Sequence, residues 1–146
     1  MKVQILRLPH ARDLPIPSYA TADAAGLDLL AAIGSDLELV PGARAAIPCG
    51  IALALTEGHE AQVRPRSGLA LHHGITVLNA PGTVDSDYRG EVKAILINLG
   101  EQPFRISRGM KIAQLVFASC LRADLVEVAE LPPSLRGAGG FGSTGR

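Results

Sequence analysis

Short apolar runs separated by turn residues dominate the hydrophobic pattern of this chain. Val, Ile, Leu and Ala gather in these runs, and Gly or Pro-Gly recurs between them. The runs are KVQILRL (2–8), IALAL (51–55), ITVLN (75–79), VKAILINL (92–99), KIAQLVF (111–117) and LVEVAEL (125–131). Strands at a spacing of roughly 8–12 residues are typical of an all-β sandwich or barrel, which is the class we predict. Only SGLALHHG (67–74) has the pattern of a helix, of one or two turns.

The run VKAILINL (92–99) is apolar on both faces after Lys93. A strand of this kind is covered on both sides. The chain's own loops or a second subunit would supply that cover equally well. Ala is also abundant and large aromatic residues are scarce. Because a subunit interface would cover the second face, we expect a homo-oligomer.

Composition and charge exclude several classes of protein. The 146 residues fit one domain, and 14 basic residues balance 14 acidic ones. Without a basic excess, we expect neither nucleic acid nor an anionic membrane surface as a partner. Cys49 and Cys120 lie far apart and predict neither a zinc site nor a disulfide framework. No apolar run approaches the roughly 20 residues that span a bilayer, and no signal peptide is evident. We therefore expect a soluble, cytoplasmic protein.

The last eleven residues, RGAGGFGSTGR (136–146), differ from everything before them. Such a Gly-rich composition is typical of a flexible, disordered C-terminus. The segment also carries phosphate donors and one aromatic side chain, and these could close over an anionic ligand. We therefore divide the chain into a β domain, 1–135, and a Gly-rich lid segment, 136–146.

Two internal segments carry candidate chemistry, each with a plainer alternative. In PRSG (65–68), Arg66 offers a bidentate fork to phosphate and Ser67 adds a donor at the start of the helix. The alternative is a surface arginine followed by a capping serine. In LNAPGTVDSDYRGEV (78–92), Asp85 has the chemistry of a general base for water. The alternative is an Asp-Ser-Asp turn whose side chains bond their own backbone.

Two more polar residues interrupt apolar runs. Asp28 in AGLDL (25–29) is suited to a hydrogen-bonded structural role or to a place near a hydrated metal. Gln114 lies inside an apolar strand, where its amide needs partners.

Taken in this order, five segments resemble the deoxyuridine triphosphate diphosphatase (dUTPase) family. They are AGLDL (25–29), PRSGLALHHGI (65–75), LNAPGTVDSDYRGEV (78–92), RGMKIAQ (108–114) and RGAGGFGSTG (136–145). The resemblance implies a jelly-roll-like β subunit in a homotrimer, with active sites at the subunit interfaces. It also implies an enzyme that hydrolyses dUTP to dUMP and pyrophosphate with Mg²⁺. Such an activity keeps uracil out of DNA and supplies dUMP for thymidylate synthesis.

The resemblance also implies roles for individual residues. Asp85 matches the base that activates the attacking water, and Asp28 a carboxylate that meets the metal through water. The phosphate-gripping positions are Arg66, Ser67, Gly68 and Gln114. The uracil and deoxyribose pocket corresponds to Asn79, Thr83, Val84, Tyr88 and Lys93. In the lid, Phe141 matches an aromatic that stacks on uracil, and the β- and γ-phosphates would meet Arg136, Gly142, Ser143 and Thr144.

Three alternatives compete with this interpretation. A dCTP deaminase shares the fold, but it carries a catalytic Glu where this chain has Ile95. It also usually has Pro-Gly-Trp after the Asp, where Ser86-Asp87-Tyr88 stands here. A non-catalytic trimer of the same fold would be expected to lose Asp85 or the tail. A plain β-sandwich interaction module explains the core but not the ordered motifs. The small departures from the family pattern, Met110 and Leu27, are not expected to touch substrate.

Overall fold

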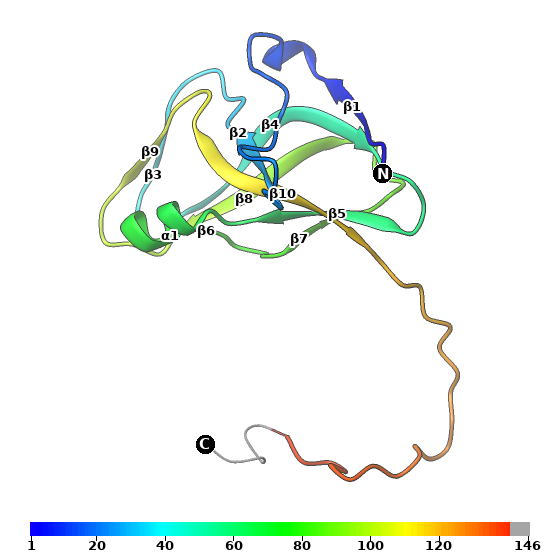
Figure 1. Ribbon diagram of the computed structural model, residues 1–146. Coiled ribbons are helices and arrows are strands. Elements are labelled where there is room, and N and C mark those ends of the chain that lie inside the picture. The colour runs from blue at the N-terminus through cyan, green and yellow to red at the C-terminus, as the bar shows by residue number, and fades with distance from the viewer. Residues whose placement is uncertain (141–146) are drawn as a thin grey trace.

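The computed structural model describes residues 1–140, which form a β barrel followed by a long C-terminal arm (Figure 1). The elements in order are β1 (Gln4–Arg7), η1 (Pro9–Ala11), β2 (Leu27–Leu30), β3 (Leu37–Leu39), β4 (Arg44–Ala54), β5 (His59–Arg64), α1 (Ser67–His73), β6 (Ile75–Val77), β7 (Gly82–Val84), β8 (Glu91–Asn98), β9 (Phe104–Ile106) and β10 (Lys111–Ser119). The predicted all-β class and the single short helix are thus confirmed.

The strands form two four-stranded sheets and one two-stranded sheet. Their orders are β1-β4-β8-β6, β2-β10-β5-β7 and β3-β9, and every pairing is antiparallel. The facing sheets bury a core of branched aliphatic side chains. Its largest fully buried apolar members are Leu29, Ile47, Ile75, Leu96, Ile106, Ile112, Leu115 and Val92. Burial of these side chains supplies most of the driving force for folding.

Strand β8 is fully covered on one face only. Val92, Ala94 and Leu96 are buried, whereas Ile95 and Ile97 on the opposite face are half-buried and Lys93 is exposed. Within residues 1–140, the loops of the chain therefore leave the second apolar face of β8 only partly covered.

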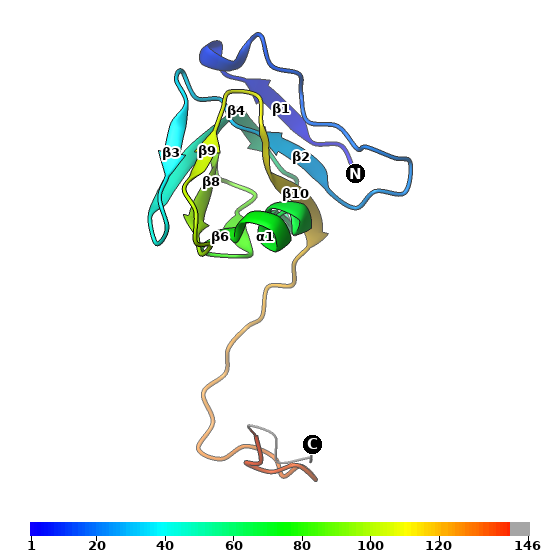
Figure 2. The same ribbon diagram turned by 90° about the vertical axis from the view of Figure 1, so that its left-hand side faces the viewer.

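The arm after β10 contradicts one prediction. LVEVAEL (125–131) is not a strand, because it finds no partner edge among the described residues and its backbone cannot form a ladder alone. Leu125 is 95% exposed and Leu131 79%. Figures 1 and 2 show this segment running away from the barrel, and it leaves apolar side chains in solvent.

Helix α1 begins differently from the capping alternative raised by the sequence. Arg66 is the N-cap residue and no side chain caps the helix there, so Ser67 is already helical. The helix ends at Gly74, whose φ of 66° lies in the left-handed region that glycine adopts without strain. The backbone of Gly100 also packs so closely that a side chain at Gly74 would collide with it.

Candidate functional site

The hairpin between β6 and β8 lines a pocket of about 310 Å³. Six residues that the sequence analysis singled out share it: Asn79, Thr83, Val84, Asp85, Tyr88 and Lys93. The other lining residues are Ala46, Glu91, Val92 and Ile95. The structure therefore brings together every residue predicted for the nucleoside pocket, with the predicted base among them.

Strand β7 anchors this hairpin to the barrel. Val84 is buried and pairs with Ala61 of β5, and Asp85 then leaves the sheet with its side chain exposed. The backbone N–H of Tyr88 donates to the Asp85 carbonyl at 3.2 Å, and Arg89 donates to the carbonyls of Ser86 and Tyr88. Backbone groups and Arg89 thus hold the turn. Among residues 1–140, no hydrogen bond or ion pair engages the Asp85 carboxylate, contrary to the self-bonded turn alternative.

A second group of candidate residues gathers where β2 and β10 meet the start of α1. Arg66 Nε lies 3.1 Å from Asp28 Oδ1, and Lys111 Nζ lies 2.7 Å from Asp28 Oδ2. Arg66 Nη1 also donates to the Lys111 carbonyl at 3.0 Å. Ser67 and Gly68 follow Arg66 and are exposed. One carboxylate therefore holds two cations beside the predicted phosphate-binding turn.

Gln114 links this cationic group to the sheet. It stands opposite both Asp28 and Arg64, and its side-chain amide donates to the Pro65 carbonyl at 3.0 Å. A Cβ at Gly26 would lie 2.5 Å from Gln114 Oε1, so this amide position requires glycine there. The amide thereby fixes the backbone immediately before Arg66.

Sequence reasoning did not identify Lys111 or Gly26 as part of this group. Both residues lie inside segments that carry the family resemblance, AGLDL (25–29) and RGMKIAQ (108–114), but no role was predicted for either of them. The cross-strand register of β10 and β2 alone brings Lys111 close to Asp28. The steric demand on Gly26 arises only because Gln114 packs over it.

The two groups occupy separate parts of one chain. Val84 pairs with Ala61, and Arg66 comes five residues later, a span of about 16 Å at strand geometry. Asp28 is three strands from β7, or about 14 Å across the sheet. The hairpin pocket and the two hollows beside Asp28 and Gln114 share no lining residue. A single ligand in the hairpin pocket is therefore not enclosed by both groups of the same chain.

The predicted lid residues lie at the end of the arm. Arg136 Nε donates to the Gly139 carbonyl at 2.7 Å, within a turn that also includes Ser134 and Gly137. Phe141, Gly142, Ser143 and Thr144 lie outside the described residues, so their predicted roles stay predictions.

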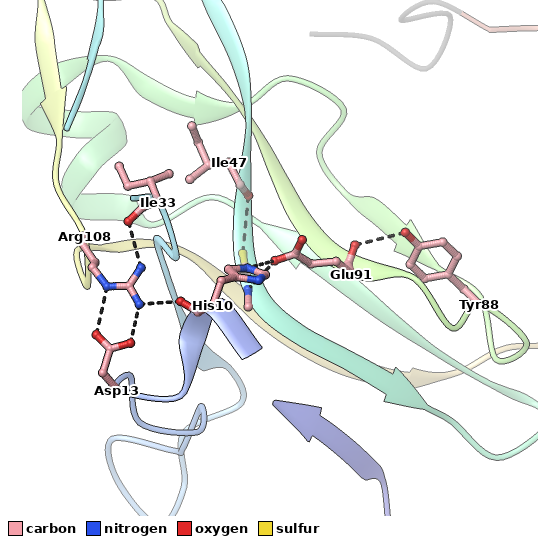
Figure 3. A network of polar contacts seen from close by, with 9 residues as sticks. His10, Asp13, Ile33, Ile47, Tyr88, Glu91 and Arg108 are labelled. Carbon is pink, nitrogen blue, oxygen red and sulfur yellow. Dashed lines mark hydrogen bonds and ion pairs between the residues drawn. The ribbon is translucent and has the colours of Figure 1, made fainter. Parts of the chain in front are cut away.

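A polar network approaches the pocket from the N-terminal turn (Figure 3). Arg108 donates to the Asp13 carboxylate at 2.5 and 3.0 Å, and also to the carbonyls of His10 and Ile33. The hydrogen bonds from Arg108 lower the pKa of Asp13 below its usual value. His10 in turn reaches Glu91, one of the residues lining the pocket.

Cys49 lies in the core beside this network. Its thiol lies 3.8 Å from the Ile47 carbonyl, and burial raises its pKa to about 12. The thiol is therefore neutral at physiological pH and a poor nucleophile.

The described part of the chain provides few ligands for a metal ion. Within residues 1–140, no group of three or more His, Cys, Asp or Glu side chains is arranged to hold one. Asp28 offers hard carboxylate oxygens, but both already contact cations. This donor set suits an ion reached through water better than one bound directly. In the same range, no helix has the length and apolar character needed to cross a membrane.

Fold and geometry together define an all-β subunit with a pocket at the hairpin between β6 and β8 and a separate group in which one carboxylate holds two cations. Comparison with known proteins identifies the family. The dUTPase family profile matches residues 12–145, and the chain belongs to this family.

Individual relatives agree with this assignment. The deoxyuridine 5'-triphosphate nucleotidohydrolase of Methylocella silvestris is 60% identical, over 99% of this chain and 92% of that protein. The dUTPase of Staphylococcus bacteriophage 80alpha, solved with dUpNHpp, has a TM-score of 0.87 at 24% identity and 99% coverage of both chains. A mutant dUTPase from phage phi11 of S. aureus, whose structure describes coordination of a structural Mg(II) ion, has a TM-score of 0.77 at 21% identity, covering 89% of this chain and 98% of that one. At these identities the two phage structures support the fold alone.

Proposed function

We propose that this protein hydrolyses dUTP to dUMP and pyrophosphate. The observation that carries the proposal is the hairpin pocket, in which the unengaged Asp85 carboxylate lies beside Asn79, Tyr88 and Lys93. The activity named for the 60% identical relative supports the same assignment. In the cell, this reaction would keep uracil out of DNA and supply dUMP for thymidylate synthesis.

Asp85 acts as the general base in the proposed mechanism. Its carboxylate orients a water molecule and takes its proton as the water oxygen attacks the α-phosphorus. The new bond joins the water oxygen to the α-phosphorus, and the bond from that phosphorus to the bridging oxygen breaks in line. Pyrophosphate leaves with the electron pair of that bond. Phosphoryl chemistry of this kind depends mainly on positioning and charge neutralisation.

The unpaired edge of β7 supplies the backbone groups that would recognise the base. This strand pairs with β5 on one side only, so among the described strands its other edge has free backbone N–H and C=O groups. Such groups match the donor and acceptor pattern of uracil, and the backbone of Thr83 and Val84 would supply them. Asn79 and Lys93 complete the nucleoside pocket. The ring of Tyr88 packs against the sugar and leaves no space for a 2′-hydroxyl group.

A second copy of the chain supplies the phosphate-gripping residues Arg66, Ser67, Gly68 and Gln114. This part of the proposal follows from the separation of the two residue groups within one chain, because a triphosphate needs cations close to its pocket. The half-buried face of β8, with Ile95 and Ile97, offers apolar surface for the contact between copies. A homotrimer with interfacial active sites, as in the family pattern, satisfies both requirements.

Mg²⁺ is the proposed cofactor, held mainly by triphosphate oxygens and water. When bound, it would neutralise charge on the phosphates. Asp28 is the residue that would meet it through water, and Arg66 and Lys111 fix the direction of that carboxylate.

The last segment of the proposal is the lid, residues 136–146, attached to the β domain of residues 1–135. Phe141 would stack on the uracil ring, and Arg136, Gly142, Ser143 and Thr144 would bind the β- and γ-phosphates. Lid closure would exclude water from the site and strengthen each charge interaction inside it. The exposed arm that precedes the lid would allow the lid to reach another copy of the chain.

A substrate panel tests the proposed activity. Pyrophosphate release is measured with dUTP, dCTP, dTTP and UTP in the presence of Mg²⁺, and only dUTP should be turned over efficiently. Comparable turnover of all four nucleotides would refute the assignment. Ammonia release from dCTP would favour a deaminase, an activity for which Ile95 supplies no proton-transferring group.

A further inference from the structure

Glu91, the first residue of β8, holds the C-terminal end of the hairpin in place. Its Oε1 accepts the backbone N–H of Gly50 at 2.8 Å and lies 2.9 Å from His10 Nε2. Its backbone carbonyl accepts the Tyr88 hydroxyl at 3.1 Å. One residue therefore joins the tyrosine of the proposed sugar pocket to two segments outside the hairpin (Figure 3).

Gly50 presents a rigid donor to this carboxylate. It lies where the β4–β8 register shifts, between Pro48 and Ala52, and its φ is 70°. A side chain at Gly50 would collide with Ala11 of η1. The carbonyl of Gly50 also accepts the Leu8 N–H at 2.9 Å, so both of its backbone polar groups are engaged. Packing therefore fixes the position of the Gly50 N–H that donates to the Glu91 carboxylate.

His10 approaches the same carboxylate oxygen from η1. The Arg108 guanidinium holds this turn through the His10 carbonyl and the Asp13 carboxylate. The Glu91 side chain is only 17% exposed, whereas that of His10 is 45% exposed. The bond to Gly50 is therefore the better shielded of the two contacts, and we expect it to contribute more.

Tyr88 is 46% exposed, and two contacts place its ring. Its ring packs over Gly90 so closely that any side chain at Gly90 would collide with the hydroxyl end of the ring. The ring position is then set by the Glu91 carbonyl that receives the hydroxyl. That carbonyl is held both by the pairing of Glu91 with Ala52 in the sheet and by the contacts of the Glu91 side chain.

We infer that Glu91 is a positioning residue that sets the Tyr88 ring in the pocket, and thereby the selectivity for a deoxyribose over a ribose. This inference rests on the proposed dUTP hydrolysis for its effect on selectivity. Glu91 itself holds the pocket wall and takes no part in the proton transfer assigned to Asp85.

The experiment labels the full-length protein with 3-fluorotyrosine and observes it by fluorine NMR. The chain contains only two tyrosines, so Tyr19 provides an internal reference and Tyr88→Phe assigns the signals. Glu91→Ala should shift or broaden the Tyr88 signal and leave that of Tyr19 unchanged. Glu91→Gln retains an oxygen that can accept the Gly50 N–H, so it should restore most of the wild-type signal.

Steady-state kinetics supply the second readout. Glu91→Ala should raise KM for dUTP about fivefold, the effect of one neutral hydrogen bond, with a smaller change in kcat. The ratio of kcat/KM for dUTP to that for UTP should fall. The matched control is Glu101→Ala, since Glu101 is exposed and follows the opposite end of β8, which lies about 23 Å along the strand from Glu91.

An unchanged Tyr88 signal in folded Glu91→Ala overturns the inference. An unchanged selectivity ratio overturns it as well. If Glu91→Ala does not fold, the His10→Ala variant tests the inference instead. It should move the Tyr88 signal in the direction expected for Glu91→Ala, but by a smaller amount. No movement there also overturns the inference. The NMR readout needs no turnover, so a wild-type protein inactive on dUTP would refute the proposed function while leaving the positioning of Tyr88 to be judged separately.

Discussion

Lys111 and Asp28 form an ion pair of 2.7 Å where β10 lies against β2, although 83 positions separate them in the chain. Arg66 occupies the other oxygen of the same carboxylate. Asp28 therefore orders two cations that would otherwise be free to turn towards solvent. Under the proposed function, this arrangement predicts that Asp28 contributes to phosphate binding independently of any metal.

Asp28→Asn is expected to weaken binding of dUTP more than it slows the chemical step. The amide keeps the size of the carboxylate but loses the charge that orders Arg66 and Lys111. We expect KM for dUTP to rise about tenfold, as for loss of one charge-assisted hydrogen bond. Asp36→Asn is the control, because Asp36 forms an exposed ion pair with Arg105 on the separate β3–β9 sheet. Equal KM values in the two variants would contradict this role.

Gly26→Ala is expected to displace the Gln114 amide, since the new Cβ would lie 2.5 Å from its oxygen. Because the nearest atom is the end of a flexible side chain on a half-buried residue, the amide can move and the loss of stability should be small. The displaced amide would also release the Pro65 carbonyl and loosen the turn that carries Arg66. Chemical denaturation and dUTP affinity, measured on Gly26→Ala, Gln114→Ala and the double variant, form a double-mutant cycle. Additive losses would show that the two residues do not interact.

Asp85→Asn should retain nucleotide binding and lose turnover. The amide cannot accept the proton of the attacking water, and loss of a general base lowers kcat by about 10²–10⁴-fold. Turnover is followed by pyrophosphate release, and binding by calorimetry with a non-hydrolysable imido analogue of dUTP. Asp87→Asn is the matched control, because Asp87 belongs to the same turn but does not line the hairpin pocket. Retained turnover in Asp85→Asn would rule out the base role.

Cys49 predicts a loss of stability at high pH. A thiol in the unfolded chain ionises near its ordinary pKa of 9.0, whereas the buried Cys49 thiol does so only near about 12. Because the unfolded state loses its proton first, the free energy of unfolding should fall as pH rises from 9 towards 12. Denaturation of Cys120→Ser is compared with that of Cys49→Ala/Cys120→Ser, which lacks both thiols. Identical pH slopes for the two variants would argue against the shift.

Deletion of residues 136–146 should lower turnover sharply and leave the assembly of subunits intact. The apolar arm and the β8 face remain in the shortened chain, whereas the proposed lid residues are removed. Steady-state kinetics give the turnover, and light scattering gives the molecular mass. A shortened protein that hydrolyses dUTP at the full rate would show that the segment is no lid.

Local chemistry made much of this protein predictable. The segment from 78 to 93 carries the predicted pocket residues within a few positions of one another, and its resemblance to a family motif grouped them. Helix α1 was predictable from its own short segment, since it begins after Pro65 and ends at Gly74.

The strand predicted at 125–131 failed for a physical reason. Its apolar pattern is real, but a strand forms only when a neighbouring edge accepts its backbone hydrogen bonds, and no such edge among the described residues does so. The apolar pattern of a sequence indicates which side chains need to be buried. It does not indicate which surface buries them.

The sequence by itself determined the class of fold and the family and supplied the candidate nucleotide-binding residues, because each depends on side-chain type and short spacing. Tertiary structure alone decided that Lys111 contacts Asp28, that Glu91 joins Tyr88 to Gly50 and His10, and that Arg66 lies far from Asp85. These relationships depend on strand register and on close packing between segments many residues apart. Strand register and packing depend on contacts made across the whole folded chain. No local stretch of the sequence therefore predicts them.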